Sequence, residues 1–313
     1  MGRAIGSNAK IAGVFEATPG VTPNAGFFSI PLASHTMGEE RPLIASDLLG
    51  LGREPQDPIS DVATNVGDMV VPVDVRNFGR WLKLAFGAPT EASGTGGEEV
   101  HTFASGAAAL PSMSIEIGAP EVPAFSVNYG ARLNQLKIGM TRSGLLNATC
   151  SLIAIGETAP VAATVMPAPT VLPVLRFAQA TGSILKDGVA LASVTAADLS
   201  FSNNLDPVET IKADGRIEDS DPGMVMASGS LTVRFRDTVL MAAASSGTPC
   251  ELDFGWTNGP HSLLFRLPRV FLPPAKRPIQ GPKGITAQFN WQASGALAAS
   301  MTAILTNDVA SYA

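Results

Sequence analysis

The stretch Gly67-Asp-Met-Val-Val-Pro-Val-Asp-Val-Arg-Asn-Phe-Gly-Arg-Trp-Leu-Lys-Leu-Ala-Phe-Gly87 contains a strand followed by a helix. Its second part carries an apolar stripe at positions i, i+3, i+4, i+7 and i+8: Phe78, Trp81, Leu82, Ala85 and Phe86. Asp74 suits the N-cap, and Gly87 suits the position just past the end of the helix. The stretch therefore predicts a helix over about residues 75–86, with one face on a core.

The same unit occurs a second time in the chain. Three glycines recur at offsets of 163, 162 and 160 residues: Gly52, Gly67 and Gly87 are matched by Gly215, Gly229 and Gly247. Asp237 precedes a second predicted helix over about residues 238–246. Each half ends in a long strand that opens on Gly144 or Gly284. This offset is 140 because the first half carries an extra Gly-rich loop. An ordered series of matches indicates an internal repeat.

Segments that alternate apolar and polar residues make up most of the remaining sequence. Residues 145–154 and 285–292 are typical of strands with one solvent-exposed face. We therefore predict a mainly β fold with two tandem β-barrel or β-sandwich domains, each with one flanking α-helix. The first domain covers residues 1–160, a Pro-rich linker covers 161–173, and the second domain covers 174–313.

The composition excludes several classes of protein. The 313 residues carry a net charge of −6, so the field of the protein repels a phosphate backbone. The charged fraction is only 15 %, and we expect so sparsely charged a surface to be covered by other protein. No apolar run approaches the roughly 18–20 residues that span a bilayer, so no membrane partner is expected. Cys150 and Cys250 are expected to be reduced and partly buried, because the chain start lacks the apolar core of an export signal.

The sequence offers little that could carry catalysis. His35, His101 and His261 occur without a metal-binding spacing, and the Gly-rich loop at residues 94–97 lacks the Lys-Ser/Thr pair of a phosphate loop. Cys150 lies on the apolar side of a strand pattern with no histidine nearby in sequence. We therefore predict a protein that is not an enzyme, with no catalytic residues, no metal and no cofactor.

The segment at residues 38–66 is too long for an ordinary connection between strands. Its apolar residues are interleaved with eight charged ones, and a disordered linker does not carry such apolar residues. We predict an arm that docks on another subunit; the alternative is that the segment folds back on its own domain. The candidate docking residues are Arg41, Leu43, Ile44, Leu48, Leu49, Leu51, Arg53 and Asp57.

Two runs of the sequence resemble the major tail tube proteins of long-tailed bacteriophages. These runs are Arg41-Pro-Leu-Ile-Ala-Ser-Asp-Leu-Leu-Gly-Leu-Gly-Arg-Glu-Pro-Gln-Asp-Pro and residues 67–87, and the resemblance is strongest over residues 1–155. It implies a structural virion protein whose rings stack into a hollow tube for DNA ejection. It also implies that the arm at 38–66 reaches the adjacent ring and that both helices brace the outside.

The resemblance further implies the partners. They are other copies of this chain, the tape measure protein and DNA within the lumen without specific binding, and terminator and baseplate proteins at the ends. Two domains per chain suggest trimeric, pseudo-hexameric rings, with hexamers as the alternative. The tube is expected to be assembled in the bacterial host cytoplasm and to reside in the virion.

Charge and aromatic content bear on the remaining expectations. Residues 1–160 carry a net charge of −5 and residues 161–313 a net charge of −1, so we expect more acidic than basic side chains along the bore. The alternatives are another tail component, such as a terminator or baseplate ring protein, a receptor- or carbohydrate-binding β-sandwich, and a hydrolase. Three Trp and two Tyr offer little for sugar stacking.

Overall fold

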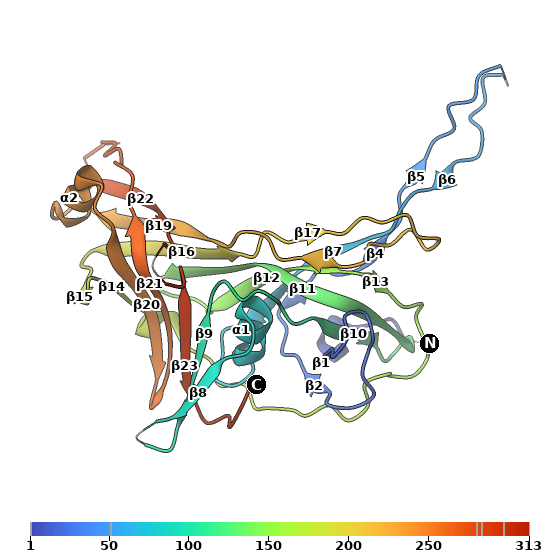
Figure 1. The fold of residues 1–313 in the computed structure, drawn as a ribbon, viewed down its shortest axis with the longest axis horizontal. Coiled ribbons are helices and arrows are strands. Elements are labelled where there is room, and N and C mark those ends of the chain that lie inside the picture. The colour runs from blue at the N-terminus through green and yellow to red at the C-terminus, as the bar shows by residue number, and fades with distance from the viewer. Residues whose placement is uncertain are drawn as a thin grey trace.

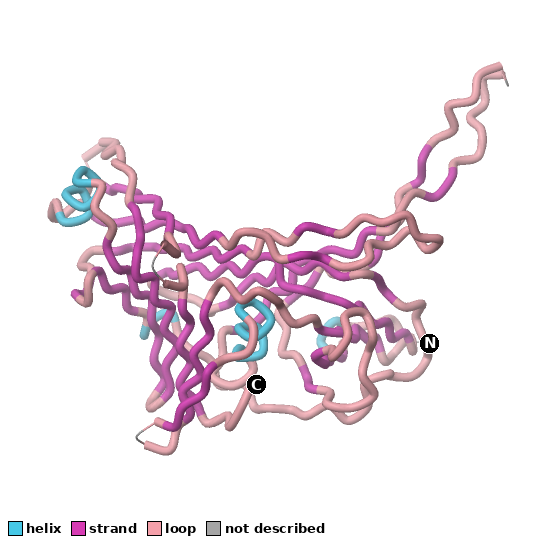
Figure 2. Tube along the Cα trace, in the orientation of Figure 1, coloured by secondary structure: helices cyan, strands magenta, loops and turns pink. Residues whose placement is uncertain are grey.

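The computed structural model describes residues 2–50, 52–94, 96–279, 281–282, 284–296 and 298–312. The protein is mainly β with two α-helices, α1 (Phe78–Phe86) and α2 (Val239–Ser246), which confirms the predicted fold class (Figures 1 and 2). Two short 3-10 turns, η1 (Gly6–Asn8) and η2 (Gln179–Thr181), complete the helical structure of the described residues.

The largest layer, here called the central sheet, is antiparallel throughout and is drawn as the near-horizontal strands of Figure 1. Its strands follow one another in space as β3 (Ser34–His35) with β4 (Glu39–Glu40), then β7 (Thr64–Pro72), β12 (Asn147–Ala154), β11 (Ala124–Thr141), β16 (Val194–Ser202), β19 (Met226–Arg234) and β22 (Thr286–Ala293).

A second layer, the side sheet, crosses one end of the central sheet (Figure 1). Its strands lie in the order β15 (Val189–Ala190), β14 (Ser183–Lys186), β20 (Cys250–Asn258), β21 (His261–Phe271), β23 (Thr302–Asn307), β9 (Glu99–Ala104) and β8 (Thr90–Ser93). The pairs Val270↔Ala293 and Phe271↔Gln292 join it to the central sheet. Within the described residues, no ladder closes into a barrel.

Smaller ladders complete the fold. The first part of β11 belongs to a third sheet with β2 (Phe28–Ser29), β1 (Lys10–Phe15), β10 (Met113–Ala119) and β13 (Gly156–Glu157). Two hairpins stand apart: β5 (Leu43–Ile44) with β6 (Ile59–Ser60), and β17 (Asp206–Pro207) with β18 (Ser220–Asp221).

Hydrogen-bonded ladders cross the predicted division of the chain. β11 pairs with β16 over seven residue pairs, and β9 pairs with β23 over six. The segment 161–173 runs along the third sheet, where the Thr170 amide donates to the Phe27 carbonyl oxygen at 2.9 Å. The two-domain division with its linker stays a prediction.

The two halves share one strand register. In the first half His35 lies opposite Met69 and Glu39 opposite Asn65. Adding 162 to each number gives Ala197 opposite Leu231 and Phe201 opposite Ala227, which are the pairs of β16 with β19. The strands therefore repeat with the offset that relates Gly67 to Gly229.

The same close approach of neighbouring backbone requires glycine at both of these positions. A Cβ on Gly67 would lie 2.6 Å from the backbone nitrogen of Met37, and a Cβ on Gly229 would collide with the backbone oxygen of Asp198. Asp198 is the counterpart of Thr36, the residue before Met37, at the offset of 162. Only glycine lets the neighbouring backbone come this close.

The final strands of the two halves also correspond. The Val73 amide donates to the Leu146 carbonyl oxygen at 3.1 Å, and the Phe235 amide donates to the Ile285 carbonyl oxygen at 2.9 Å. Val73 and Phe235 differ by 162, whereas Leu146 and Ile285 differ by 139. The offset for the final strands is therefore 139 rather than the 140 inferred through Gly144 and Gly284.

Helix α1 packs between the sheets. Its buried side chains, each at most 3 % exposed, are Phe78, Trp81, Leu82, Leu84, Ala85 and Phe86. This burial is more complete than the resemblance implies for a brace on the outside. α1 begins at Phe78 rather than 75, because Asp74 instead accepts amide hydrogen bonds within the preceding turn, at 3.1 Å from Asn77. The C-terminal Tyr312 packs on the helix at Gly79.

Helix α2 lies at the periphery and buries only Leu240 and Ala244. It spans nearly the predicted range, and the Asp237 carboxylate accepts the Val239 amide at 3.1 Å. Gly247 adopts the left-handed conformation, with φ of 64°, that favours glycine at a helix end. The two helices thus follow equivalent strands but differ in burial.

Candidate assembly surfaces

The predicted arm is a hairpin that projects from the body of the protein (Figure 1). β5 and β6 pair through Leu43↔Ser60 and Ile44↔Ile59. The apolar side chains along it are exposed by 45 % to 94 %: Leu43, Ile44, Leu48, Leu49, Ile59 and Val62. Within one copy, the described arm therefore presents a row of unburied apolar groups.

The structure places the other predicted arm residues as follows. Arg41 lies at the base of the arm, whereas Arg53 and Asp57 lie in its exposed distal part. Leu51 lies outside the described residues. The described candidates thus share one projecting segment, with Arg41 at its base, Leu43 and Ile44 in the β5–β6 ladder and the others beyond it.

An ion-pair cluster fixes the base of the arm. Arg216 donates to Glu39 through Nε at 2.6 Å and through Nη2 at 3.1 Å. Arg41 donates from Nε to the same carboxylate at 3.1 Å and from Nη2 to the Asp214 carbonyl oxygen at 2.8 Å. The Ala63 amide donates to the Gly215 carbonyl oxygen at 2.9 Å. Both strands of the arm are therefore tied to residues 214–216.

The cluster also controls ionisation. Burial by itself would raise the pKa of Glu39, but hydrogen bonds from Arg216, the Glu157 amide and Arg41 outweigh it and hold that pKa below its ordinary value. The bond with Glu39 raises the pKa of Arg216. The pair is therefore ionised at neutral pH.

Residues 203–225, here called the second segment, are the counterpart of the arm. They join β16 to β19 as residues 41–63 join β4 to β7, and both connections contain 23 residues. The second segment lies back along the body of the protein: Arg132 donates to the Asp219 carboxylate at 2.5 Å, and the Asn203 side chain donates to the Ala85 carbonyl oxygen at 3.0 Å. Sequence reasoning missed this segment, although the match of Gly52 to Gly215 was a signal for it.

One face of the central sheet is buried and the other is polar. A rung across the buried face consists of Met69, Cys150, Leu136, Phe201 and Ala227, each at most 1 % exposed. The opposite face, here called the polar face, carries mainly polar side chains, as in the rung Lys137, Ser200, Ser228 and Gln292, and it also includes Val66, Val70 and Ile153.

The polar face carries few charges. Its exposed charged residues in the described strands are Glu40, Asp68, Asp198, Lys137 and Arg234. Ser151 donates to the Asp68 carboxylate at 2.6 Å, and Ser230 donates to Asp198. Arg132 is paired with Asp219. A polyanion would meet three acids, two bases and many neutral groups on this surface.

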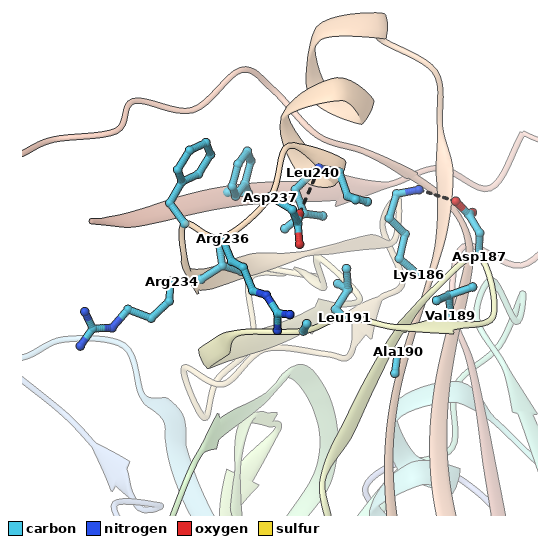
Figure 3. Close-up of a pocket in the computed structure, with 14 residues that line it drawn as sticks. Lys186, Asp187, Val189, Ala190, Leu191, Arg234, Arg236, Asp237 and Leu240 are labelled. Atoms are coloured by element: carbon cyan, nitrogen blue, oxygen red, sulfur yellow. Dashed lines mark hydrogen bonds and ion pairs between the residues drawn. The ribbon is translucent and has the colours of Figure 1, made fainter. Parts of the chain in front are cut away.

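Figure 3 shows a cavity lined by apolar and charged side chains. It measures about 330 Å³ and lies between α2, the end of β19 and the β14–β15 hairpin. Its described lining contains no Ser, Thr, Cys or His. Lys186 is paired with Asp187, and Asp237 is engaged by the Val239 amide (Figure 3).

The other chemically reactive groups are dispersed. Cys150 and Cys250 are free and are more fully buried than the partial burial expected from the sequence, and burial raises the pKa of the Cys150 thiol. His101 is buried and contacts the Asn307 side chain at 3.1 Å. Across the described ranges, no group of three His, Cys, Asp or Glu is placed to hold a metal ion. No described helix has both the length and the apolar character needed to cross a membrane.

Comparison with known proteins gives one match of nearly full length. A family model described as phage tail tube protein matches residues 6–293, which include the arm, the second segment and all strands of the central sheet. No curated protein matches the chain.

Proposed function

The chain belongs to the phage tail tube protein family, and on that premise we propose that it polymerises as stacked rings into a hollow tube that conducts DNA into the host. Family membership makes it a structural component of the phage tail. The observation that carries the finer proposal is the projecting hairpin at residues 43–60, whose exposed apolar side chains need a neighbour to cover them.

The arm suits a contact between rings. Leu49 is 94 % exposed and Leu48 65 % exposed, so burying them on another copy removes apolar surface from water at roughly 25 cal/mol per Å². The ion pairs of Glu39 with Arg216 and Arg41 hold the base of the hairpin, which reduces the entropy lost when the distal part docks. The arm therefore reaches the adjacent ring and joins successive rings.

The polar face suits the wall of a conduit. Each Lys or Arg that contacts phosphate strengthens binding to DNA, so a wall that lets DNA slide needs few cations. Lys137 and Arg234 are the exposed bases of this face, against the acids Glu40, Asp68 and Asp198. In the tube this face lines the bore, where DNA and the tape measure protein pass without specific binding.

The shared register favours three copies in a ring. One chain carries two equivalent sets of strands, related by 162 and 139 residues, so three chains supply six such sets. Rings of this kind are trimeric with pseudo-sixfold symmetry, and they meet terminator and baseplate proteins at the tube ends. Assembly takes place in the cytoplasm of the bacterial host.

Electron microscopy of the purified full-length chain tests this function. We expect hollow tubes, and we expect a variant with residues 46–57 replaced by a Gly-Ser turn to give separate rings. The β5–β6 ladder remains in that variant, so the base of the arm is preserved. Tubes that still grow at the normal rate without residues 46–57 would show that the arm does not join rings.

A further inference from the structure

Both margins of the central sheet have little strand pairing on their outer side within one copy. At one margin, β22 meets β21 only at Val270↔Ala293 and Phe271↔Gln292. Residues 273–279 follow β21 without joining a ladder, and Lys276, Arg277 and Ile279 are exposed, Ile279 by 76 %. At the other margin, β3 and β4 pair with a strand on one side only, β7, and on the outer side the Glu39 amide donates to the Glu157 carboxylate at 2.9 Å, a bond that pairing with a neighbour replaces. β4 and β22 lie at opposite ends of this sheet (Figure 1). Margins of this kind invite strand addition.

The chain contains an internal template for the missing contact. In the first half, residues 132–141 of β11 lie between β12 and β16, so that this strand joins the two halves. β16 is the counterpart of β3 and β4 at the offset of 162. The pairing of β11 with β16 within the chain therefore predicts a pairing between chains, in which the counterpart of β11 pairs with β3 and β4.

Correspondences before and after this part of β11 identify the residues of the second half that are equivalent to it. Phe271↔Gln292 corresponds to Arg132↔Ile153 at an offset of 139. The Phe235–Ile285 bond corresponds to the Val73–Leu146 bond with the same offset for the acceptor. Between these anchors the two connections have equal length, so residues 274–279 correspond to residues 135–140.

We propose that residues 274–279 of one copy pair antiparallel with residues 35–40 of the next copy in the ring. The register follows from the pairs of β11 with β16: Lys137↔Ser200 becomes Lys276↔Gly38, and Leu136↔Phe201 becomes Ala275↔Glu39. This pairing rests on the proposed function, since it closes the ring that the function requires. The partner is a second copy of this chain.

The prolines of the segment fit this direction. The Asn203 amide donates to the Asn134 carbonyl oxygen at 2.8 Å, so alternate residues from Asn134 onward direct their amides to β16. The counterpart of Asn134 is Pro273, which has no amide hydrogen, whereas Ala275, Arg277 and Ile279 direct amides to the neighbouring copy. Pro274 and Pro278, which also lack an amide hydrogen, fall on the side of β22. From residue 275 onward the prolines therefore weaken pairing within the chain and leave the amides of the outer side available.

Charge complements the register. In this register Lys276 lies diagonally opposite Glu40, at a separation that long side chains span. Arg277 lies diagonally opposite Glu39, whose carboxylate already accepts hydrogen bonds from Arg216 and Arg41. Within the chain, Lys137 lies opposite Ser200 with Ser202 and Asp198 as its diagonal neighbours, so both pairings place a lysine near an acid. The opposite charges of the two margins favour a neighbouring copy over pairing of identical margins.

Disulfide trapping tests the register. Lys276↔Gly38 is a pair without mutual hydrogen bonds, where the Cα atoms of an antiparallel ladder lie about 4.5 Å apart, within the range of a disulfide. We expect full-length Gly38→Cys/Lys276→Cys, oxidised under assembly conditions, to shift from monomer to covalent dimer and trimer on a non-reducing gel. Ser34→Cys/Lys276→Cys, about 13 Å out of register, is expected to stay monomeric.

Charge reversal provides a second test that needs no new cysteine. We expect Glu40→Lys or Lys276→Glu alone to reduce ring formation in sedimentation and the double reversal to restore it. Normal tubes without trapping of the 38–276 pair, or with trapping of the 34–276 pair instead, would overturn the register while leaving the tube function intact. A wild-type chain that forms no ring would overturn both.

Discussion

Arg216 holds Glu39 through two hydrogen bonds, of 2.6 Å and 3.1 Å, although 177 residues separate them in sequence. The contact joins the base of the arm to the equivalent connection of the second half. It also places both connections at one end of the central sheet, where the Ala63 amide meets the Gly215 carbonyl oxygen. The orientation of the arm thus depends on the second half of the chain.

Replacing Arg216 with Ala should therefore destabilise the protein. Hydrogen bonds to charged groups contribute about 1.5–3 kcal/mol, and Glu39 is left with fewer donors in a largely covered position. Urea unfolding of Arg216→Ala should show a loss in that range. Arg53→Ala, which changes an exposed arginine in the distal part of the arm, should stay within about 0.5 kcal/mol of wild type. Equal losses in both variants would mean that the cluster does not fix the base.

Acid should weaken the same contact. The folded pKa of Glu39 is below the ordinary value of 4.5, so its contribution is present above that value and is lost as pH falls through the folded pKa. The unfolding free energy of wild type should therefore exceed that of Glu39→Gln at pH 7, and the two should converge as pH falls through the folded pKa of Glu39, which lies below 4.5. A difference that is constant with pH would contradict this assignment.

The repeated glycines should be intolerant of a side chain. Gly67→Ala and Gly229→Ala each force a methyl group into backbone of the neighbouring strand, at an expected cost of about 1–3 kcal/mol in thermal or urea unfolding. Gly139→Ala is the matched control, since nothing lies within 4 Å of its added Cβ. If Gly139→Ala is as costly as the other two, the effect comes from strand glycine in general and not from close approach.

Several parts of this fold follow from sequence patterns, because they depend on local periodicity. Alternation over residues 146–154 predicts the buried face that includes Leu146, Cys150 and Ala154. The glycines predict both helix ends, since Gly87 and Gly247 each have positive φ. The repeat offset of 162 anticipates the register of two separate strand pairs.

Other parts depend on contacts that no local pattern encodes. The pairing of β9 with β23 joins residues about 200 apart, and α1 is buried on both sides because a second sheet crosses over it. Asp74 looks like a helix cap but closes the turn before the helix. The folding back of the second segment is set by Arg132 with Asp219 and by Arg216 with Glu39, which are long-range ion pairs.

The arm should matter for assembly and not for folding. Leu49→Asp changes a side chain that is 94 % exposed in one copy, so its unfolding free energy should stay within about 0.5 kcal/mol of wild type. Tube growth measured by light scattering should be strongly reduced, because the charge prevents burial on the next ring. Unimpaired growth of Leu49→Asp would remove Leu49 from the docking surface.

Three-dimensional reconstruction of the polymer formed by the full-length protein tests the central claim most directly. We expect a hollow cylinder of stacked rings, three copies in each ring, with the polar face of the central sheet toward the bore and the hairpin at 43–60 on the adjacent ring. A protein that remains monomeric at every concentration, or a cylinder with another surface toward its bore, would contradict it.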